Sequence, residues 1–190
     1  SVALERLSIP PRDSILAEND WFPVYARLDD LAPVDTGHAA VRAALDDAAG
    51  LGVVGLVDLE FGQRWEVWAD RWSHGCDRLR IRTGAYANTL DDVIATGLRT
   101  GDPLPGCDER VTMARLKIIS DGSLNTRTAW CCDPYADGDR LQHPHGQPNL
   151  DFDELTRLLS TAHTNGLEVA THAIGDAAVG QALDACAQTG

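Results

Sequence analysis

Apolar residues in this chain fall into short runs that alternate with longer amphipathic segments. From Asp35 onward, apolar positions at helical spacing lead into a short apolar run, and this order recurs four times. The apolar runs predict strands near residues 53–58, 79–84, 115–120 and 167–172. The segments around them predict helices over about 35–49, 63–74, 89–98, 151–165 and 176–188. Strands that alternate with helices form βα units, so the sequence predicts a parallel sheet.

Residues 1–35 follow neither the helical nor the strand period. Pro10, Pro11, Pro23 and Pro33 interrupt any long helix there. We therefore interpret residues 1–35 as an irregular segment.

Two architectures combine a parallel sheet with helices, the open doubly wound sheet and the (β/α)8 barrel. No glycine-rich nucleotide-binding motif follows any of the predicted strands, which favours the barrel. A complete barrel has eight strands and about 250 residues, whereas four strands are predicted here. The expected fold is therefore α/β, a partial (β/α)8 TIM-type barrel of about four parallel strands with flanking helices.

Charge and cysteine content narrow the range of partners. The net charge is −13, and such a negative field repels phosphate, so nucleic acid is not an expected partner. No apolar run approaches the roughly 18–20 residues of a membrane span, so no membrane association is expected. The five cysteines include no CxxC pair, and this fits a reducing cytoplasm.

Lysine usage singles out one residue. The chain has 16 basic residues, and Lys117 is its only lysine, inside the apolar run 114–119. A buried ammonium has to be paired, neutralised or extended to water, and Asp58 and Asp121 are candidate partners at neighbouring strand ends. Unlike arginine, lysine can become a neutral amine that attacks carbonyl groups or takes up CO2 as a carbamate. A structural lysine, a Schiff-base nucleophile and a metal-binding carbamate remain open.

His172 ends the last predicted strand, where functional residues of parallel α/β folds gather. Asp176 follows four residues later. If His172 binds a metal, Asp176 could accept a hydrogen bond from the imidazole ring and so fix its orientation. The alternative for His172 is an ordinary hydrogen-bonded structural histidine.

The other histidines and a tryptophan cluster have simpler interpretations. The pair His143 and His145 has metal-ligand spacing but lies in a loop rich in Gly, Pro and Asp, so we interpret it as solvated. We interpret the remaining histidines as surface residues: His38, His74 and His163. Three tryptophans at helical spacing predict a packed helix face: Trp65, Trp68 and Trp72.

Two longer segments resemble a known family. LKIISDGSLNTRTAWCCDPYAD (116–137) and EVATHAIGDAAVGQALDA (168–185) are similar to the strand-4 and strand-5 motifs of metal-dependent amidohydrolases. Within that superfamily, they resemble the subfamily of N-substituted formamide deformylases and exoenzyme-regulator-like amidohydrolases. GLGVVGLVD (50–58) resembles the same family's strand 2, so the resemblance covers about residues 40–190.

The resemblance implies a set of roles. Lys117, as a carbamate, and His172 would be ligands of a divalent metal, zinc, in the full-length protein. Asp121, Ser123 and Arg127 would lie beside the substrate. The family's other metal ligands and its catalytic aspartate have no counterpart here, so we expect them outside both ends of this chain. Residues 1–35 would end an insertion before strand 2, and residues 36–190 would hold strands 2 to 5.

The parent protein is therefore expected to hydrolyse an amide or related C–N bond of a small molecule by metal-activated water. The chain alone is expected to be inactive, to hold no metal and to associate with itself through its exposed sheet edges. Two alternatives remain, a non-catalytic binding or regulatory domain on the same scaffold and a Schiff-base enzyme that uses Lys117.

Overall fold

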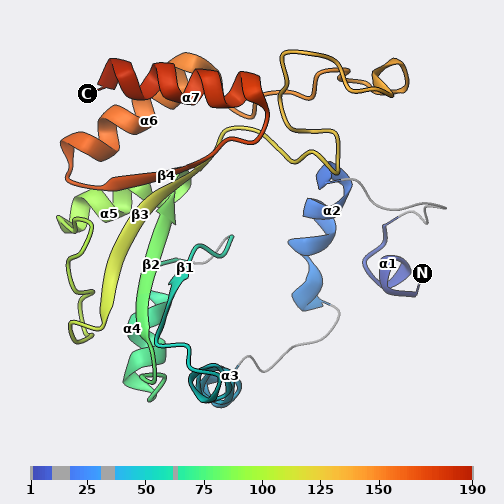
Figure 1. The fold of residues 1–190 in the computed structure, drawn as a ribbon. Coiled ribbons are helices and arrows are strands. Elements are labelled where there is room, and N and C mark those ends of the chain that lie inside the picture. The colour runs from blue at the N-terminus through green and yellow to red at the C-terminus, as the bar shows by residue number, and fades with distance from the viewer. Residues whose placement is uncertain (1, 10–17, 31–36, 62–63, 190) are drawn as a thin grey trace.

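The computed structural model describes residues 2–9, 18–30, 37–61 and 64–189. Four parallel strands form one sheet in the order β1-β2-β3-β4, as predicted (Figure 1). The strands are β1 (Gly55–Asp58), β2 (Arg80–Tyr86), β3 (Val111–Ile119) and β4 (Glu168–His172). Strand order and parallel pairing confirm the predicted half-barrel.

Each strand is flanked by helices at the predicted places. These are α3 (His38–Gly50), α4 (Val67–Ser73), α5 (Leu90–Thr96), α6 (Phe152–Thr164) and α7 (Asp176–Thr189). Short 3-10 turns lie at Ala87–Thr89 and Gly138–Arg140. Helix α6 begins at Asp151, whose side chain accepts a hydrogen bond from the Glu154 amide at 2.8 Å.

The core lies between the sheet and helices α4, α5 and α6. Strand β2 turns Ile81, Thr83 and Ala85 toward these helices, and all three are buried. Trp65 and Trp68 are buried in the same cluster and Trp72 packs against it, as the tryptophan spacing predicted. The opposite face of the sheet, which would be the interior of a complete barrel, carries the candidate site.

A bulge in β3 decides which side chains reach that inner face. Thr83 is paired with Met113, but Ala85 is paired with Leu116, so β3 has one residue more than β2 between these pairs. The extra residue shifts the alternation of the strand. Leu116 and Ile118 therefore face the helices, while Lys117 faces inward.

The N-terminal segment differs from the irregular chain that the prolines predicted. It contains α1 (Val2–Arg6), α2 (Glu18–Tyr25) and a 3-10 turn at Leu28–Asp30, and Pro23 lies inside α2. Pro23 is the sixth residue of this eight-residue helix, so the helix lacks the one hydrogen bond that an amide at this position would donate to the carbonyl four residues earlier. Figure 1 shows α2 over the inner face of the sheet, away from α4, α5 and α6.

Over the described residues, no helix is both long enough and apolar enough to cross a membrane.

Candidate metal and substrate site

Lys117 and His172 lie on the same inner face, at the carboxyl ends of adjacent strands. In the β3–β4 register, Lys117 is opposite Ala170 and Ile119 is opposite His172. Paired residues of neighbouring strands point to the same side, and Lys117 and Ile119 are two positions apart. The two side chains that the sequence singled out are therefore brought to one place.

Lys117 is partly buried and lacks a partner. Across the ranges that the structure describes, its ammonium group forms neither a hydrogen bond nor an ion pair. Burial lowers the pKa of Lys117, because desolvation disfavours the charged form. Neither expected carboxylate reaches it. Asp58 instead accepts a hydrogen bond from Trp68 Nε1 at 2.7 Å, on the helix side of the sheet.

The ring of His172 is held in one orientation. Its Nε2 donates to the carbonyl oxygen of Gly122 at 2.8 Å, and Asp121 Oδ1 lies 3.6 Å from the same nitrogen. With its proton on Nε2, the neutral ring has its lone pair on Nδ1, the nitrogen that can bind a metal.

The carboxylate beside this ring belongs to Asp121, whereas Asp176 was expected there. Asp176 accepts hydrogen bonds from the amides of Cys132, at 2.8 Å, and Ala177, at 3.0 Å. It begins α7 and joins that helix to the loop after β3, and these contacts lower the pKa of Asp176, the Cys132 amide most. The four-residue spacing placed Asp176 near His172 in sequence, but α7 turns it away from the ring.

Asp121 is fully buried and serves as an anchor for backbone groups. Its carboxylate accepts hydrogen bonds from the amides of Trp130 at 2.9 Å, Ile174 at 3.0 Å and Gly175 at 2.8 Å. These contacts join the loop that follows β3 to the loop that follows β4. Asp121 of the segment 116–137 is therefore hydrogen-bonded directly to Gly175 of the segment 168–185.

Ser123 and Arg127 also make contacts within their own loop. Ser123 Oγ lies 2.7 Å from Asn125 Oδ1 and from Thr126 Oγ1. Arg127 has a φ of 61° and its Nε donates to Asp137 at 3.2 Å. These two side chains and Asp121 hold the shape of the loop, whereas Gly122 and Thr128 of the same loop line the neighbouring cavity.

A cavity of about 600 Å³ lies between α2 and the inner face of the sheet. Its wall is strongly aromatic. Phe22 of α2 contacts Phe61 edge-on at 6.2 Å between ring centroids, and Phe61 stacks on Tyr86 at 5.2 Å. Lys117 is one of the residues that line this cavity. This aromatic wall was not predicted from the sequence, because Phe22 lies in the segment interpreted as irregular.

His143 and His145 were interpreted from the sequence as solvated loop residues, and the structure agrees. His143 and His145 are exposed, and His145 Nδ1 donates to the carbonyl oxygen of Cys132 at 3.0 Å, within the loop after β3.

A half-barrel with its polar side chains at the carboxyl ends of the strands places the chain among the (β/α)-barrel proteins. Residues 13–190 match the model of the Amidohydrolase family. The chain therefore belongs to this family.

Individual relatives agree with the family assignment. The chain is 40% identical over 75 residues to a Bacillus subtilis (strain 168) protein named "Putative amidohydrolase YtcJ", a match that covers 40% of this chain and 14% of that protein. Two solved structures are described as uncharacterized metal-dependent hydrolases. The one from Pyrococcus furiosus has a TM-score of 0.73 and 24% identity and covers 100% of this chain. The one from Pyrococcus horikoshii OT3 has a TM-score of 0.71 and 27% identity and covers 98%. This chain spans 40% and 38% of those two structures.

Proposed function

We propose that this chain is part of a metal-dependent hydrolase that cleaves an amide or related C–N bond, with Lys117 and His172 as ligands of a divalent metal. One observation carries the proposal: the chain's single lysine is partly buried and unpaired on the same face of the sheet as His172, whose Nε2 donates to the Gly122 carbonyl and leaves the Nδ1 lone pair available. The family assignment supports it, as does the similarity to two Pyrococcus proteins described as metal-dependent hydrolases.

The two residues fit a divalent metal chemically. A lowered pKa increases the neutral fraction of the Lys117 amine, the form that adds CO2 to give a carbamate. The carbamate oxygens and the imidazole nitrogen are ligands that zinc accepts. A bound metal would supply a water of lowered pKa and would polarise the scissile carbonyl.

The remaining residues prepare the site. The Gly122 carbonyl fixes the tautomer of His172, and Asp121 holds the loop that carries Gly122. We propose that this loop contributes to substrate binding through Gly122 and Thr128, with Asp121, Ser123 and Arg127 maintaining its shape.

The aromatic cavity suggests what the substrate carries next to its reacting bond. Phe22, Phe61 and Tyr86 form an apolar wall beside Lys117. Apolar surface favours burial of an apolar or aromatic substituent. We propose a small-molecule amide with such a substituent as the substrate class.

Metal content of the full-length protein tests the proposal. Lys117→Arg keeps a positive charge but cannot form a carbamate, so this variant should lose metal and hydrolysis together. In a Lys117→Ala background, a short carboxylic acid should partly restore both. Arg115→Ala, two residues earlier on β3, is the matched control and should retain full metal. Full metal occupancy in Lys117→Arg, measured by elemental analysis, would refute the ligand role.

The lowered pKa of Lys117 favours one alternative, in which the neutral amine forms a Schiff base with a carbonyl substrate. Borohydride reduction in the presence of a carbonyl compound would then attach the compound to Lys117. An unmodified peptide carrying Lys117 in mass spectrometry would exclude this alternative.

A further inference from the structure

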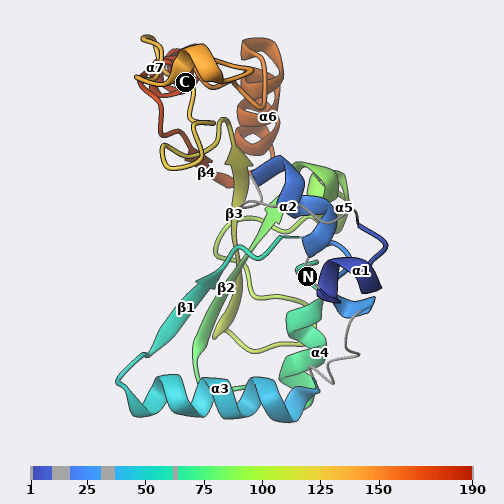
Figure 2. The ribbon, with the colours of Figure 1, turned by 90° about the vertical axis from the view of Figure 1, so that its right-hand side faces the viewer.

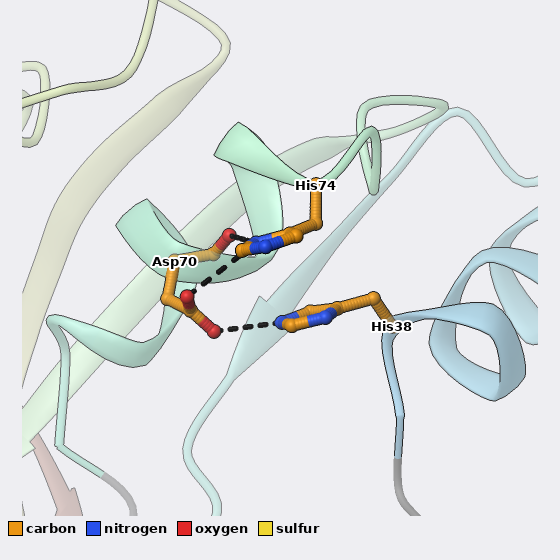
Figure 3. A group of neighbouring side chains, drawn as sticks. All are labelled: His38, Asp70 and His74. Atoms are coloured by element: carbon orange, nitrogen blue, oxygen red, sulfur yellow. Dashed lines mark hydrogen bonds and ion pairs between the residues drawn. The ribbon is translucent and has the colours of Figure 1, made fainter.

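Two histidines and one aspartate form a cluster at the end of the sheet where the strands begin. His38 is the first residue of α3, Asp70 lies in α4, and His74 follows the last residue of α4. Figures 1 and 2 show α3 and the end of α4 together, at the opposite end of β2 from the rim that carries the end of β3. Figure 3 shows the His38 ring directed at the Asp70 carboxylate, while the His74 ring faces both that carboxylate and the Asp70 backbone oxygen, which is 2.9 Å from His74 Nδ1.

The ligand atoms of the three side chains converge. His38 Nε2 lies 2.7 Å from Asp70 Oδ2, and His74 Nδ1 lies 3.4 Å from Asp70 Oδ1. One nitrogen from each ring and one carboxylate oxygen all lie within 4.8 Å of one another. Ligands around a tetrahedral zinc at bonds of 2.0–2.1 Å are about 3.3 Å apart, so small side-chain rotations would complete this geometry.

The exposure of the three residues leaves room for a further ligand. The side chains of His38, Asp70 and His74 are 33%, 60% and 52% exposed. Water can therefore reach the cluster and fill a fourth coordination position. Imidazole nitrogen and carboxylate oxygen suit zinc and similar transition metals, whereas Mg²⁺ prefers oxygen ligands alone.

The two imidazole rings also lie against each other. They are stacked face to face, with centroids 3.8 Å apart and planes within 4°. A neutral imidazole ring can carry its proton on either nitrogen, so each ring can present a lone pair on the side that faces Asp70. A divalent cation there would bind both nitrogens and the carboxylate, and the rings would tilt apart to aim their lone pairs at it. Two guanidinium groups oppose a cation there: Arg42, which donates to the His74 carbonyl at 2.6 Å, and Arg71, which follows Asp70 in α4.

We propose that His38, Asp70 and His74 form an accessory binding site for a divalent transition metal of the zinc class, which fastens the start of α3 to the end of α4. His38 and Asp70 are 32 residues apart, so a metal there is a cross-link between two elements. At the amino ends of barrel strands, residues generally act in stability and not in catalysis. The site is therefore structural, and it does not depend on the function proposed for Lys117 and His172.

Zinc titration of the purified chain tests this site. The sequence predicted a chain that holds no metal, because His38 and His74 were interpreted as surface residues; with this site, the chelator-treated chain should instead bind one equivalent of Zn²⁺. Its unfolding temperature should rise with Zn²⁺, while Mg²⁺ should have no effect. His38→Ala and His74→Ala should each weaken zinc binding at least tenfold and remove the thermal shift. His163→Ala, an exposed histidine on α6, is the matched control and should bind as the unmodified chain does. His172→Ala and Lys117→Met should also bind normally, which separates this site from the strand-end site.

A measurement on the unmodified chain covers the case in which a variant does not fold. Added Co²⁺ should broaden the ring proton resonances of His38 and His74 before those of the other four histidines. Zinc affinity unchanged in folded His38→Ala or His74→Ala, or Co²⁺ broadening centred on another histidine, would overturn the proposal. Zinc binding no tighter than that of free imidazole would do so as well.

Discussion

At the scale of single residues, Asp121 and Gly175 of the two family motifs hold the site's loops together through hydrogen bonds to backbone amides. Gly175 donates its amide to Asp121 at 2.8 Å, and a Cβ atom at position 175 would lie 1.8 Å from the Trp130 carbonyl oxygen. Only glycine allows the loop after β4 to approach the loop after β3 this closely. Asp121 then satisfies three amides that this approach buries.

Gly175→Ala tests the close approach. The added methyl group has to displace the backbone at Trp130, so we expect the free energy of unfolding to fall by about 1–3 kcal/mol in urea titrations. Gly180→Ala is the matched control, because a Cβ there meets no atom within 4 Å and α7 should gain up to about 1 kcal/mol. Equal stability of the Gly175→Ala and unmodified chains would contradict this account of the motif.

Asp121→Ala tests the anchoring carboxylate. The substitution leaves three amides without an acceptor, each of which costs about 1–3 kcal/mol when buried. We therefore expect a loss of several kcal/mol, together with faster hydrogen exchange at the Ile174 and Gly175 amides. The control Asp176→Ala removes an exposed carboxylate that accepts from two amides and should cost clearly less than Asp121→Ala. An Asp121→Ala chain as stable as the control would be inconsistent with the anchoring role.

The Lys117 amine provides a pH test in the metal-free chain. Burial lowers its pKa in the folded state, so between the folded and unfolded pKa values the unfolded chain binds more protons. Stability should accordingly rise with pH across that window, and Lys117→Met should remove this contribution. Because the chain has one lysine, its ¹³Cε resonance reports the titration directly. A midpoint at or above the ordinary lysine value would contradict the observed desolvation.

At the scale of elements, α2 depends on aromatic contacts for its place over the cavity. Phe22 meets Phe61, which stacks on Tyr86, and the Tyr25 hydroxyl donates to Glu60. The loop after β1 therefore supports both the helix and the cavity wall. A helix of eight residues is not stable by itself, so these contacts maintain it.

Phe61→Ala should loosen α2. An aromatic pair contributes about 0.5–1.5 kcal/mol beyond its buried area, and this substitution removes two such pairs. We expect faster hydrogen exchange over Glu18–Tyr25 with little change in α6, measured by mass spectrometry. Leu51→Ala, which removes an exposed apolar side chain, serves as the control. Unchanged exchange in α2 would mean that the helix is held by other contacts.

At the scale of the whole molecule, the half-barrel leaves β1 at an open edge. Apolar side chains are exposed on this strand and just before it, with Val54 71% and Val57 52% exposed. Such an edge presents unpaired backbone groups next to apolar surface, a combination that recruits further strands.

The isolated chain should therefore self-associate, as size-exclusion chromatography with light scattering can show. Val54→Lys should shift the chain toward monomer, because a charge on an edge strand opposes pairing. Leu183→Lys on α7 is the matched control, since Leu183 is also exposed but belongs to the helix that follows β4, the strand at the other side of the sheet from β1. A monomer over a wide concentration range would count against the prediction.

The elements and their order follow from local patterns in the sequence. The apolar runs and helical periods predicted all four strands and the helices α3 to α7, because each pattern depends on residues that are neighbours along the chain. The motifs also pointed to Lys117 and His172, since a lone lysine among arginines and a histidine at a strand end are visible without coordinates.

Side-chain partners and directions were decided by the tertiary structure. The bulge opposite β2 turns Lys117 inward, and a strand pattern read alone does not show where an extra residue is inserted. Asp121 replaces Asp176 beside His172, because the two loops pack on one carboxylate. His38 meets Asp70 only because α3 and α4 converge at one end of the sheet. Contacts between residues far apart in sequence depend on how whole elements pack, and local periodicity carries no information about that packing.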